Sequence, residues 1–317
     1  MHIISKDKLI YSMSYRNQPV VIIKPGEKVC FQTYDCFENQ FDPPETSYSG
    51  IDWNRINPAT GPVFIDGAEP GDILVVQIEK IELDTKGVIF SGPNEIFQES
   101  IKRNSLKRVP ISDNHAVFNK KINIPLNPMI GVIGTAPKDE VVSNASPGDH
   151  GGNMDCKEIK EGTTLYLPVN VPGGLFALGD LHAAMGDGEV TSGVEVAGEV
   201  IVNIELIKEK SWGPPMAATG EHIMFIASSD LLEVAIKNAV NAMKDWLKKE
   251  LKMDATEASM LLSVLGNVHI CQVVNPLKTA RMQMPIWVVK KYGYNIPYLY
   301  KAMTDGAELG SNYKNDN

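Results

Sequence analysis

Short runs rich in Val, Ile, Thr and aromatic residues recur along the first part of the chain, and turn-forming residues separate them. Such runs predict β-strands, and their spacing is typical of an all-β sandwich or barrel. Two separators place Pro directly before Gly, at residues 25–26 and 70–71. This order predicts type II turns, whose third position requires a positive φ. The clearest runs cover residues 10–15, 19–34, 71–83, 131–136, 163–171 and 198–207.

The pattern changes after "KSWGPP" at residues 210–215. From Ser228 through Lys252 the chain predicts an amphipathic helix, with Ser228 or Ser229 as its N-cap. A second helix is predicted to begin at Asp254, which can cap it, with Glu257 as the capping-box partner. The apolar face of the first helix comprises Leu231, Leu232, Ala235, Ala239, Ala242, Met243, Trp246 and Leu247.

Two apolar runs after the helices, "VHICQVV" at residues 268–274 and "MPIWVV" at residues 284–289, predict strands. The fold class is therefore α+β, with a β-rich, sandwich-like or jelly-roll-like body over residues 1–210 and an appended C-terminal α/β subdomain over residues 211–317. The body is expected to carry most of the functional site. The polar tail at residues 308–317 is expected to fray.

Composition is that of a globular protein, because 43% of the 317 residues are hydrophobic and 22% are charged. A net charge of -9 without a long basic run argues against binding to nucleic acid or anionic lipid. No apolar run reaches the roughly 18 to 20 residues of a membrane span, and the first residues lack a signal-peptide pattern, so a cytoplasmic location is expected. Four cysteines without C-x-x-C spacing are expected to be free thiols in the core: Cys30, Cys36, Cys156 and Cys271.

One stretch, "GDLHAAMGDGEV" at residues 179–190, combines acidic side chains and a histidine with glycines and has few residues that could build a core. If a strand continues to His182, then Asp180 and His182 point to the same face. Imidazole and carboxylate are a common ligand pair for zinc and related ions. The structural alternative is a histidine that is hydrogen-bonded by a neighbouring aspartate. Asp187 and Glu189, which follow within a Gly-rich turn, and Glu195, which comes six residues later, favour the metal interpretation.

Two other segments carry acidic residues that could converge on this stretch. In "SPGDHGGNMDCKEI" paired glycines allow the backbone to approach a ligand closely, although a polar Ω-loop is the alternative interpretation. In "TYDCF" an aspartate ends an apolar strand, where a turn or capping role is the alternative. The candidate residues of these segments are Asp35, Asp149, His150, Gly151, Gly152, Asn153 and Asp155.

These motifs together resemble the acetamidase/formamidase family of amide hydrolases. The resemblance rests on "HGGNMD", "GTTLYLPVNVPGGLFALGDLHAAMGDGEV", "EHIMFIASSDLLEVA" and "CQVVNPLKTAR", and it runs from the "YDCF" region to at least Arg281. It implies a β-sandwich body with a C-terminal α+β part, a divalent metal site and homo-oligomers, either dimers or dimers of dimers. It also implies hydrolysis of short aliphatic amides to ammonia and a carboxylate.

The family motifs match this chain at most of the candidate positions, with two departures. Met185 stands where many relatives have Gln, and a thioether cannot donate the hydrogen bond that an amide could. His150 occupies a position that varies in the family. Both departures bear on the substrate rather than on the fold. The matching positions are Asp35, Gly151, Gly152, Asn153, Asp155, Asp180, His182, Asp187, Gly188 and Glu189.

Amide hydrolysis needs a nucleophile, stabilisation of the oxyanion and a proton for the leaving nitrogen. A divalent metal, expected to be zinc, could supply the nucleophile and stabilise the oxyanion if Asp180, His182 and Asp35 hold it. Asp155 is the alternative to Asp35 as a ligand; if Asp35 is the ligand, Asp155 is expected to take part in catalysis. Glu189 is the expected proton carrier and Glu195 the next candidate. Backbone N–H groups at residues 151–153 (Gly151, Gly152 and Asn153) are expected to bind the substrate oxygen. Calcium is the candidate for a second, structural ion.

Other functions fit the sequence less well. The serines of "ASSD" suit helix caps better than a Ser-Ser-Lys amidase, and no nitrilase motif surrounds Cys156. His222 and His269 suit structural hydrogen bonds, with entry into the site as the alternative for His222. A non-enzymatic alternative is a calcium-stabilised β-sandwich that binds a small amide or sugar, but imidazole is a poor calcium ligand, so His182 argues against it.

Overall fold

The computed structural model describes residues 1–43, 45–97, 100–112 and 114–300. The tail at residues 308–317, which was predicted to fray, lies outside the described residues. None of the helices in these ranges is long and apolar enough to cross a membrane.

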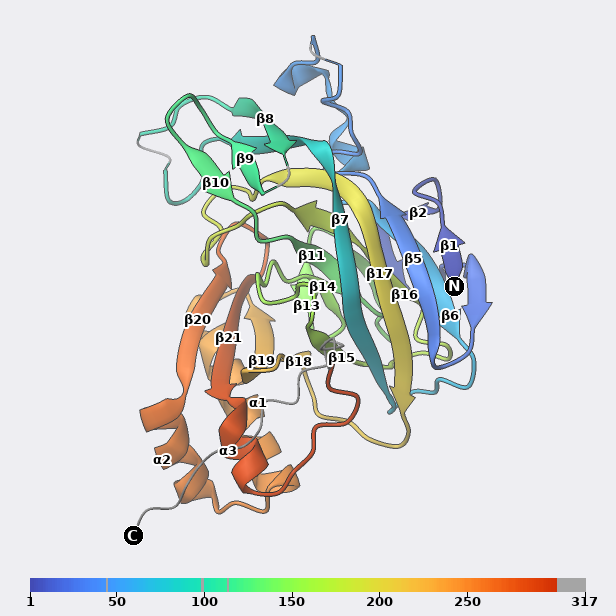
Figure 1. The fold of residues 1–317 in the computed structure, drawn as a ribbon, viewed down its shortest axis with the longest axis vertical. Coiled ribbons are helices and arrows are strands. Elements are labelled where there is room, and N and C mark those ends of the chain that lie inside the picture. The colour runs from blue at the N-terminus through green and yellow to red at the C-terminus, as the bar shows by residue number, and fades with distance from the viewer. Residues whose placement is uncertain (44, 98–99, 113, 301–317) are drawn as a thin grey trace, which may run out of the picture.

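The body is a curled and mostly antiparallel sheet, built around the two longest strands (Figure 1). These are β7 (Ile73–Ser91) and β17 (Glu195–Ile207), which pair with each other over most of their length. At the start of β7 successive side chains point to opposite faces, and both faces are buried. Leu74 and Val76 join the core of the body, whereas Ile73 and Val75 join the core of the C-terminal part. The continuous apolar run therefore belongs to a strand that is covered on both sides.

The other body strands flank this pair. Two pairings in the body are parallel, β1 with β5 and β4 with β6. The short strands β3 and β12 form a separate two-stranded sheet. The bounds are β1 (His2–Ile4), β2 (Leu9–Ile10), β3 (Ser12–Ser14), β4 (Val21–Ile23), β5 (Glu27–Thr33), β6 (Ala59–Ile65), β8 (Ser105–Ser112), β9 (His115–Val117), β10 (Asn123–Pro125), β11 (Met129–Gly134), β12 (Val141–Ser143), β13 (Pro147–Gly148), β14 (Gly151–Asn153), β15 (Thr164–Pro168) and β16 (Phe176–His182).

Both Pro-Gly separators adopt the backbone that the sequence predicts. Gly26 has φ +88° and Gly71 has φ +99°, in the left-handed region that a side chain disfavours. Gly26 N also donates to Ile204 O at 2.7 Å, which ties this turn to β17.

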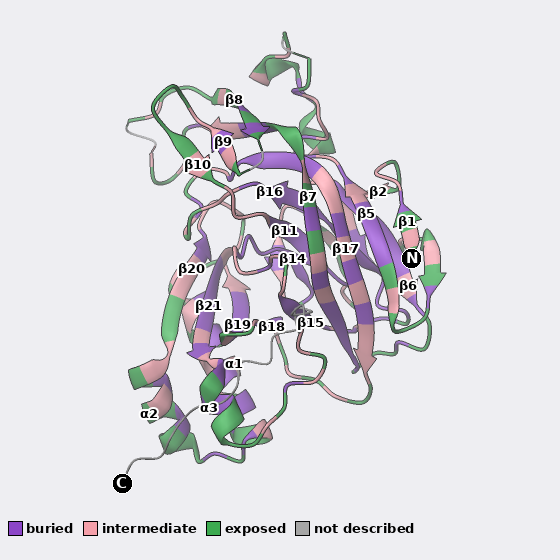
Figure 2. Ribbon diagram, in the orientation of Figure 1, coloured by how far each residue is buried: buried purple, intermediate pink, exposed green. Residues whose placement is uncertain are grey.

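The C-terminal part is a four-stranded antiparallel extension with helices packed on one face (Figure 1). Its first strand pairs with β15 of the body, so the hydrogen-bonded ladder continues from one part into the other. Figure 2 shows that α2 and α3 retain exposed faces; β19 and β21 are mostly buried, whereas β20 begins exposed and is buried only at its end. The elements are β18 (Met216–Ala218), β19 (His222–Ser229), α1 (Leu232–Glu250), α2 (Ala255–Leu265), β20 (Asn267–Gln272), β21 (Lys278–Pro285) and α3 (Ile286–Lys291).

The predicted fold class is confirmed, and so are the two long helices, but the first helix starts later than expected. Its N-cap is Leu231 rather than Ser228 or Ser229, because both serines end strand β19. Ser228 Oγ lies 2.9 Å from Thr279 Oγ1 on the paired strand, so this hydroxyl serves the sheet instead of a helix end.

The prediction of a strand at residues 284–289 holds only for Met284 and Pro285, which end β21, and is wrong from Ile286 onward. Residues 286–291 form helix α3, which follows Pro285 and buries Ile286 and Val289 while Trp287 stays exposed. An apolar pair three residues apart on one face fits a helix, and Pro is well tolerated at a helix start. A short apolar run cannot distinguish the two states by pattern alone.

Two apolar clusters dominate the described residues. The larger one fills the body. The second lies mainly between α1 and the C-terminal strands, but Ile73, Val75 and Tyr166 of the body contribute to it. The division at residue 210 remains a prediction, and the two parts share apolar contacts across it.

Asp254 caps α2 as predicted, with its side chain accepting from the backbone N–H groups of Thr256 and Glu257. We expect Asp254→Ala to lower the urea midpoint of unfolding, because two helix N–H groups lose their acceptor. Asp254→Asn is the matched control, since it keeps an oxygen in place and should lose much less. Equal midpoints of urea unfolding for the two variants would contradict the capping role.

Candidate metal centre

Strand β16 carries Asp180 and His182 into the interior. The strand pairs with β6 up to Gly179 and with β17 from Leu181 onward, so its neighbour changes at Asp180. Asp180 takes φ 56° there, a backbone conformation that side chains normally avoid. His182 is 1% exposed, and its Nε2 lies 3.4 Å from Asp180 Oδ1. The predicted Asp-x-His pair is therefore formed.

Glu195 faces His182 from the neighbouring strand. The two residues are register partners in the β16–β17 pairing, and cross-strand partners place their side chains in contact. Glu195 Oε2 lies 2.9 Å from His182 Nε2, and both side chains are buried. The strand register thus explains why a residue beyond the Gly-rich stretch reaches the centre.

Asp155 and Glu189 approach from two turns. Asp155 follows β14, and its Oδ1 lies 4.0 Å from His182 Nε2. One ligand atom of Asp155, one of His182 and one of Glu189 lie within 4.8 Å of each other. Asp155 has φ 43° and Glu189 has φ 23°, so both residues adopt a backbone that side chains normally avoid. Such conformations persist only where the surrounding structure enforces them.

Cys36 forms a second group with two of these residues. One ligand atom each of Cys36, Asp180 and Glu195 lies within 4.8 Å of the others. Asn57 N donates to Cys36 O at 2.7 Å and holds the segment in place. The sequence predicted only a core-filling thiol at this position, because nothing in its spacing pointed to a ligand.

We call the six residues Cys36, Asp155, Asp180, His182, Glu189 and Glu195 the acid cluster. Two glycines make room for it. A Cβ at Gly131 would lie 2.5 Å from Asp155 Oδ1 and 2.8 Å from Asp180 Oδ2, and a Cβ at Gly193 would lie 2.5 Å from His182 Nδ1. Neither position tolerates a side chain without displacement of the cluster.

Three asparagine amides surround the carboxylates. Asn275 Nδ2 donates to Asp155 Oδ2 at 2.6 Å, and Asn57 Nδ2 to Asp180 Oδ2 at 3.4 Å. With its nitrogen turned toward the acids, Asn153 donates to both Asp155 and Asp180. Asn275 lies in the C-terminal subdomain, so the site is not built by the body alone. Sequence reasoning missed Asn57 and Asn275, and an asparagine beside a turn gives no distinguishing signal.

Burial and mutual repulsion shift the ionisation of the cluster. Burial raises the pKa of Asp155 to about 6 and that of Glu195 to about 7, and the nearby Asp180 adds to both shifts. Burial and Asp155 also raise the pKa of Glu189 well above its ordinary value. Burial lowers the pKa of His182, but Glu195 and Asp180 outweigh that effect and raise it overall. The cluster therefore has an excess of negative charge that one imidazole only partly offsets.

The donor set fits a divalent cation. In the described part of the chain, Asp180 Oδ1, Glu189 Oε2 and Glu195 Oε2 are buried without a hydrogen bond of suitable geometry, even though His182 Nε2 lies close to two of them. Buried acceptors are normally satisfied, so groups that are not imply an ion or another partner. Carboxylates and an imidazole are ligands that zinc and related metals prefer.

The structure does not place Asp35 in the acid cluster, although the sequence predicted it as a metal ligand. Its Oδ1 accepts from Phe37 N at 2.9 Å and Asn39 N at 2.7 Å, so the side chain closes a turn after β5. This is the capping role that the sequence left open as the alternative. Its neighbour Cys36 reaches the cluster instead.

The geometry also disagrees with the prediction that N–H groups at Gly151 and Gly152 bind substrate. Strand β14 lies between β11 and β13, so its backbone is used in the sheet. A Cβ at Gly151 would lie 2.3 Å from Ile133 O, and one at Gly152 would lie 2.5 Å from Ser146 O. The glycines permit close strand packing, and Asn153 reaches the centre with its side chain.

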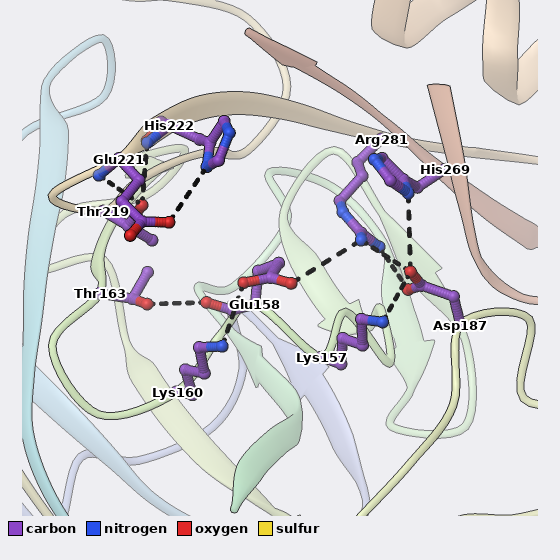
Figure 3. Close-up of polar contacts among 10 residues, drawn as sticks. All are labelled: Lys157, Glu158, Lys160, Thr163, Asp187, Thr219, Glu221, His222, His269 and Arg281. Carbon is purple, nitrogen blue, oxygen red and sulfur yellow. Dashed lines mark hydrogen bonds and ion pairs between the residues drawn. The ribbon is translucent and has the colours of Figure 1, made fainter. Parts of the chain in front are cut away.

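The remaining candidates lie outside the acid cluster. Asp187 turns away from it and pairs with Arg281, with His269 3.6 Å away (Figure 3). His222 lies beside Glu221 and Thr219, in a separate group of the same view. Cys156 is fully buried, as expected for a core thiol.

Four buried carboxylates, a thiol and one imidazole form a donor set that fits a divalent metal. The comparison with known proteins is specific. The model of the Acetamidase/Formamidase family matches residues 16–146 and 142–290. The chain belongs to this family, which confirms the resemblance seen in the sequence.

Solved structures agree with this assignment. A predicted acetamidase/formamidase from Thermoanaerobacter tengcongensis is 44% identical, with a TM-score of 0.91 over 93% of this chain and 99% of that chain. An acetamidase from Bacillus halodurans is 42% identical, with a TM-score of 0.89 over 92% and 100%. A formamidase from Methylophilus methylotrophus is 24% identical over 270 residues, which are 64% of this chain. This chain spans 61% and 65% of the lengths of two curated relatives, from Schizosaccharomyces pombe and Methylophilus.

Gly131→Ala tests the metal centre directly. We expect a saturating divalent ion to raise the melting temperature of the unmodified protein, because an ion at about 100 times its Kd stabilises the fold by about 2.7 kcal/mol. The added methyl group should displace Asp155 and Asp180 and remove most of that increase. Gly220→Ala is the matched control, since its Cβ would meet nothing within 4 Å. A full metal-dependent increase in Gly131→Ala would exclude this location for the ion.

His150 predicts a pH dependence of stability. It is 6% exposed, and burial lowers its pKa to about 4. Between about pH 6.5 and 4 the unfolded chain binds more protons than the folded chain at this residue, so stability falls with falling pH. We expect His150→Leu to reduce this decline by about 2 kcal/mol between pH 6.5 and pH 4.5, measured by urea unfolding at the two pH values. Parallel curves for the two proteins would show that His150 does not titrate in this way.

Proposed function

We propose that this protein hydrolyses short aliphatic amides to a carboxylate and ammonia with a divalent metal at the acid cluster. The observation that carries this proposal is the approach of Asp155, Asp180 and Glu195 to one buried nitrogen, His182 Nε2. Family membership and relatives named as formamidase and acetamidase support the type of reaction.

Asp180, His182 and Glu195 are the proposed ligands, with Asp155 beside them. Glu195 replaces Asp35 in this assignment, because Asp35 closes a turn whereas Glu195 lies 2.9 Å from His182. Zinc is the proposed ion, since it accepts imidazole and carboxylate together. Such an ion, when bound, polarises a carbonyl and lowers the pKa of a nearby water.

Glu189 is the proposed proton carrier. It is 8% exposed, it belongs to the turn at residues 186–189, and burial together with Asp155 raises its pKa, which favours a carboxyl group that can hold a proton for transfer. The Glu189 carboxylate accepts a proton from the attacking water as the new C–O bond forms. The same carboxyl group then donates that proton to the amide nitrogen as the C–N bond breaks, which releases ammonia and a carboxylic acid. The acid loses its remaining proton to solvent and becomes the carboxylate.

A small pocket near the end of β7 is a candidate for the binding of a short substrate. It has a volume of about 140 Å³ and is lined in part by Asp35, Phe41 and Val88. Asp35 precedes Cys36 in the chain, and Val88 is the register partner of Glu195, but no residue of the acid cluster lines the pocket. Its size favours a small amide over a peptide.

The non-catalytic alternative, a calcium-stabilised sandwich that binds an amide or sugar, is not favoured. His182 Nε2 lies at the centre of the carboxylates, where a calcium ion would require oxygen ligands. Zinc as the ion, a second calcium ion, homo-oligomers and a cytoplasmic location remain predictions.

Removal of the proton carrier should separate chemistry from metal binding. We expect Glu189→Gln to lower kcat for formamide or acetamide by about 10²- to 10⁴-fold while the metal content stays unchanged. His182→Ala or a chelator should remove both metal and ammonia release. Glu199→Gln is the matched control, because this β17 carboxylate contacts Gln32 outside the cluster. Ammonia release that survives both Glu189→Gln and chelation would refute the proposed function.

A further inference from the structure

The C-terminal subdomain holds a buried cation whose role the proposed reaction leaves open. Arg281 on β21 is 1% exposed and makes a two-point contact with Asp187. Its Nη1 lies 2.7 Å from Asp187 Oδ1, and its Nη2 lies 3.0 Å from Asp187 Oδ2 (Figure 3). Paired N–H···O bonds between a guanidinium and a carboxylate fix both distance and orientation.

Asp187 belongs to the turn at residues 186–189, which also carries Glu189. The same turn contacts the subdomain through its backbone, because Gly188 N donates to Cys271 O at 3.1 Å. Gly188 and Gln272 also form a parallel bridge. Strands β20 and β21 are paired, so the hairpin that carries Arg281 contacts the turn by backbone and by side chain.

The other charged partners of Asp187 restrict the orientation of its carboxylate less than Arg281 does. Lys157 Nζ lies 2.9 Å from Asp187 Oδ2, but its side chain is 29% exposed and makes a single contact. His269 Nδ1 is farther away, at 3.6 Å. Arg281 is itself held by Cys271 Sγ at 3.6 Å and Glu158 Oε1 at 3.9 Å. A planar, fixed guanidinium orients a carboxylate in a way that a flexible ammonium does not.

We infer that Arg281 is a positioning residue: through Asp187 it holds the turn at residues 186–189 so that Glu189 points into the acid cluster. This inference rests on the proposed function of Glu189 as the proton carrier. Glu189 takes φ 23°, and a turn in that conformation needs support from outside the turn, which the contact of Arg281 with Asp187 provides. Loss of the contact should therefore affect proton transfer more than substrate binding.

The test measures kcat and KM for formamide in Arg281→Gln, Arg281→Lys and Asp187→Asn. We expect kcat to fall about 10- to 100-fold in Arg281→Gln, because supporting partners of a site typically contribute this much, while KM changes less than about threefold. Arg281→Lys keeps the charge but not the fork, so it should recover only part of the loss. Lys210→Gln is the control, since it removes another buried-end ion pair, Lys210–Glu250, that shares no residue with the turn or with Arg281, and it should leave kcat unchanged.

A second measurement does not depend on activity. Hydrogen exchange of peptides that cover the turn at residues 186–189 should become faster in Arg281→Gln and Asp187→Asn, while exchange in α1 stays unchanged. If Arg281→Gln does not fold, Asp187→Asn decides the question, because Asp187 is partly exposed and its substitution leaves the core intact.

The double variant Glu189→Gln with Arg281→Gln separates the inference from the proposed function. If Arg281 acts through Glu189, its substitution should lower kcat no further once Glu189 is changed. Full activity in Glu189→Gln alone would refute the proton-carrier role. Two outcomes would overturn only the inference about Arg281. One is an inactive Glu189→Gln together with normal kcat and normal hydrogen exchange in Arg281→Gln. The other is a loss of kcat in the double variant that equals the product of the two single losses.

Discussion

The constraint on which the rest of the structure depends is electrostatic: several carboxylates lie around one imidazole in the interior, and this burial costs free energy. Each ionised carboxylate loses hydration there, and its neighbours repel it, so the group is stable only if protons, amides or a cation compensate. The imidazole of His182 lies close to Asp180 and Glu195 and offsets part of their charge, and three asparagine amides donate hydrogen bonds to the carboxylates. The acceptors that remain without partners define where a cation fits.

The backbone is shaped to allow this gathering. Asp155, Asp180 and Glu189 all take positive φ, at a cost of about 1 to 3 kcal/mol for each such residue. The strands paired with β16 hold Asp180, and Gly131 leaves the space that the carboxylates occupy. Three of the ten non-glycine residues with positive φ in the described chain thus belong to the acid cluster, where precise placement of side chains matters for the proposed chemistry.

The subdomain and the body act as one structure at this centre. Asn275 of the subdomain contacts Asp155 directly, and Arg281 contacts the turn that carries Glu189. The sheet continues from β15 into β18, and both parts share apolar contacts, so a firm junction supports these polar contacts. A site built across such a junction is sensitive to substitutions in either part.

The sequence by itself determined the β-rich body, the two long helices, the family and the pairing of Asp180 with His182. These follow from residue patterns and from neighbours in the chain, because period and i, i+2 spacing act locally. Only the tertiary structure decided that Cys36, Asn57 and Asn275 reach the centre and that Asp35 does not. It also decided between strand and helix at residues 286–291, where packing against the core outweighs an ambiguous apolar run. Contacts of this kind depend on strand register and on approaches between distant segments, and a single sequence carries no local signal for either.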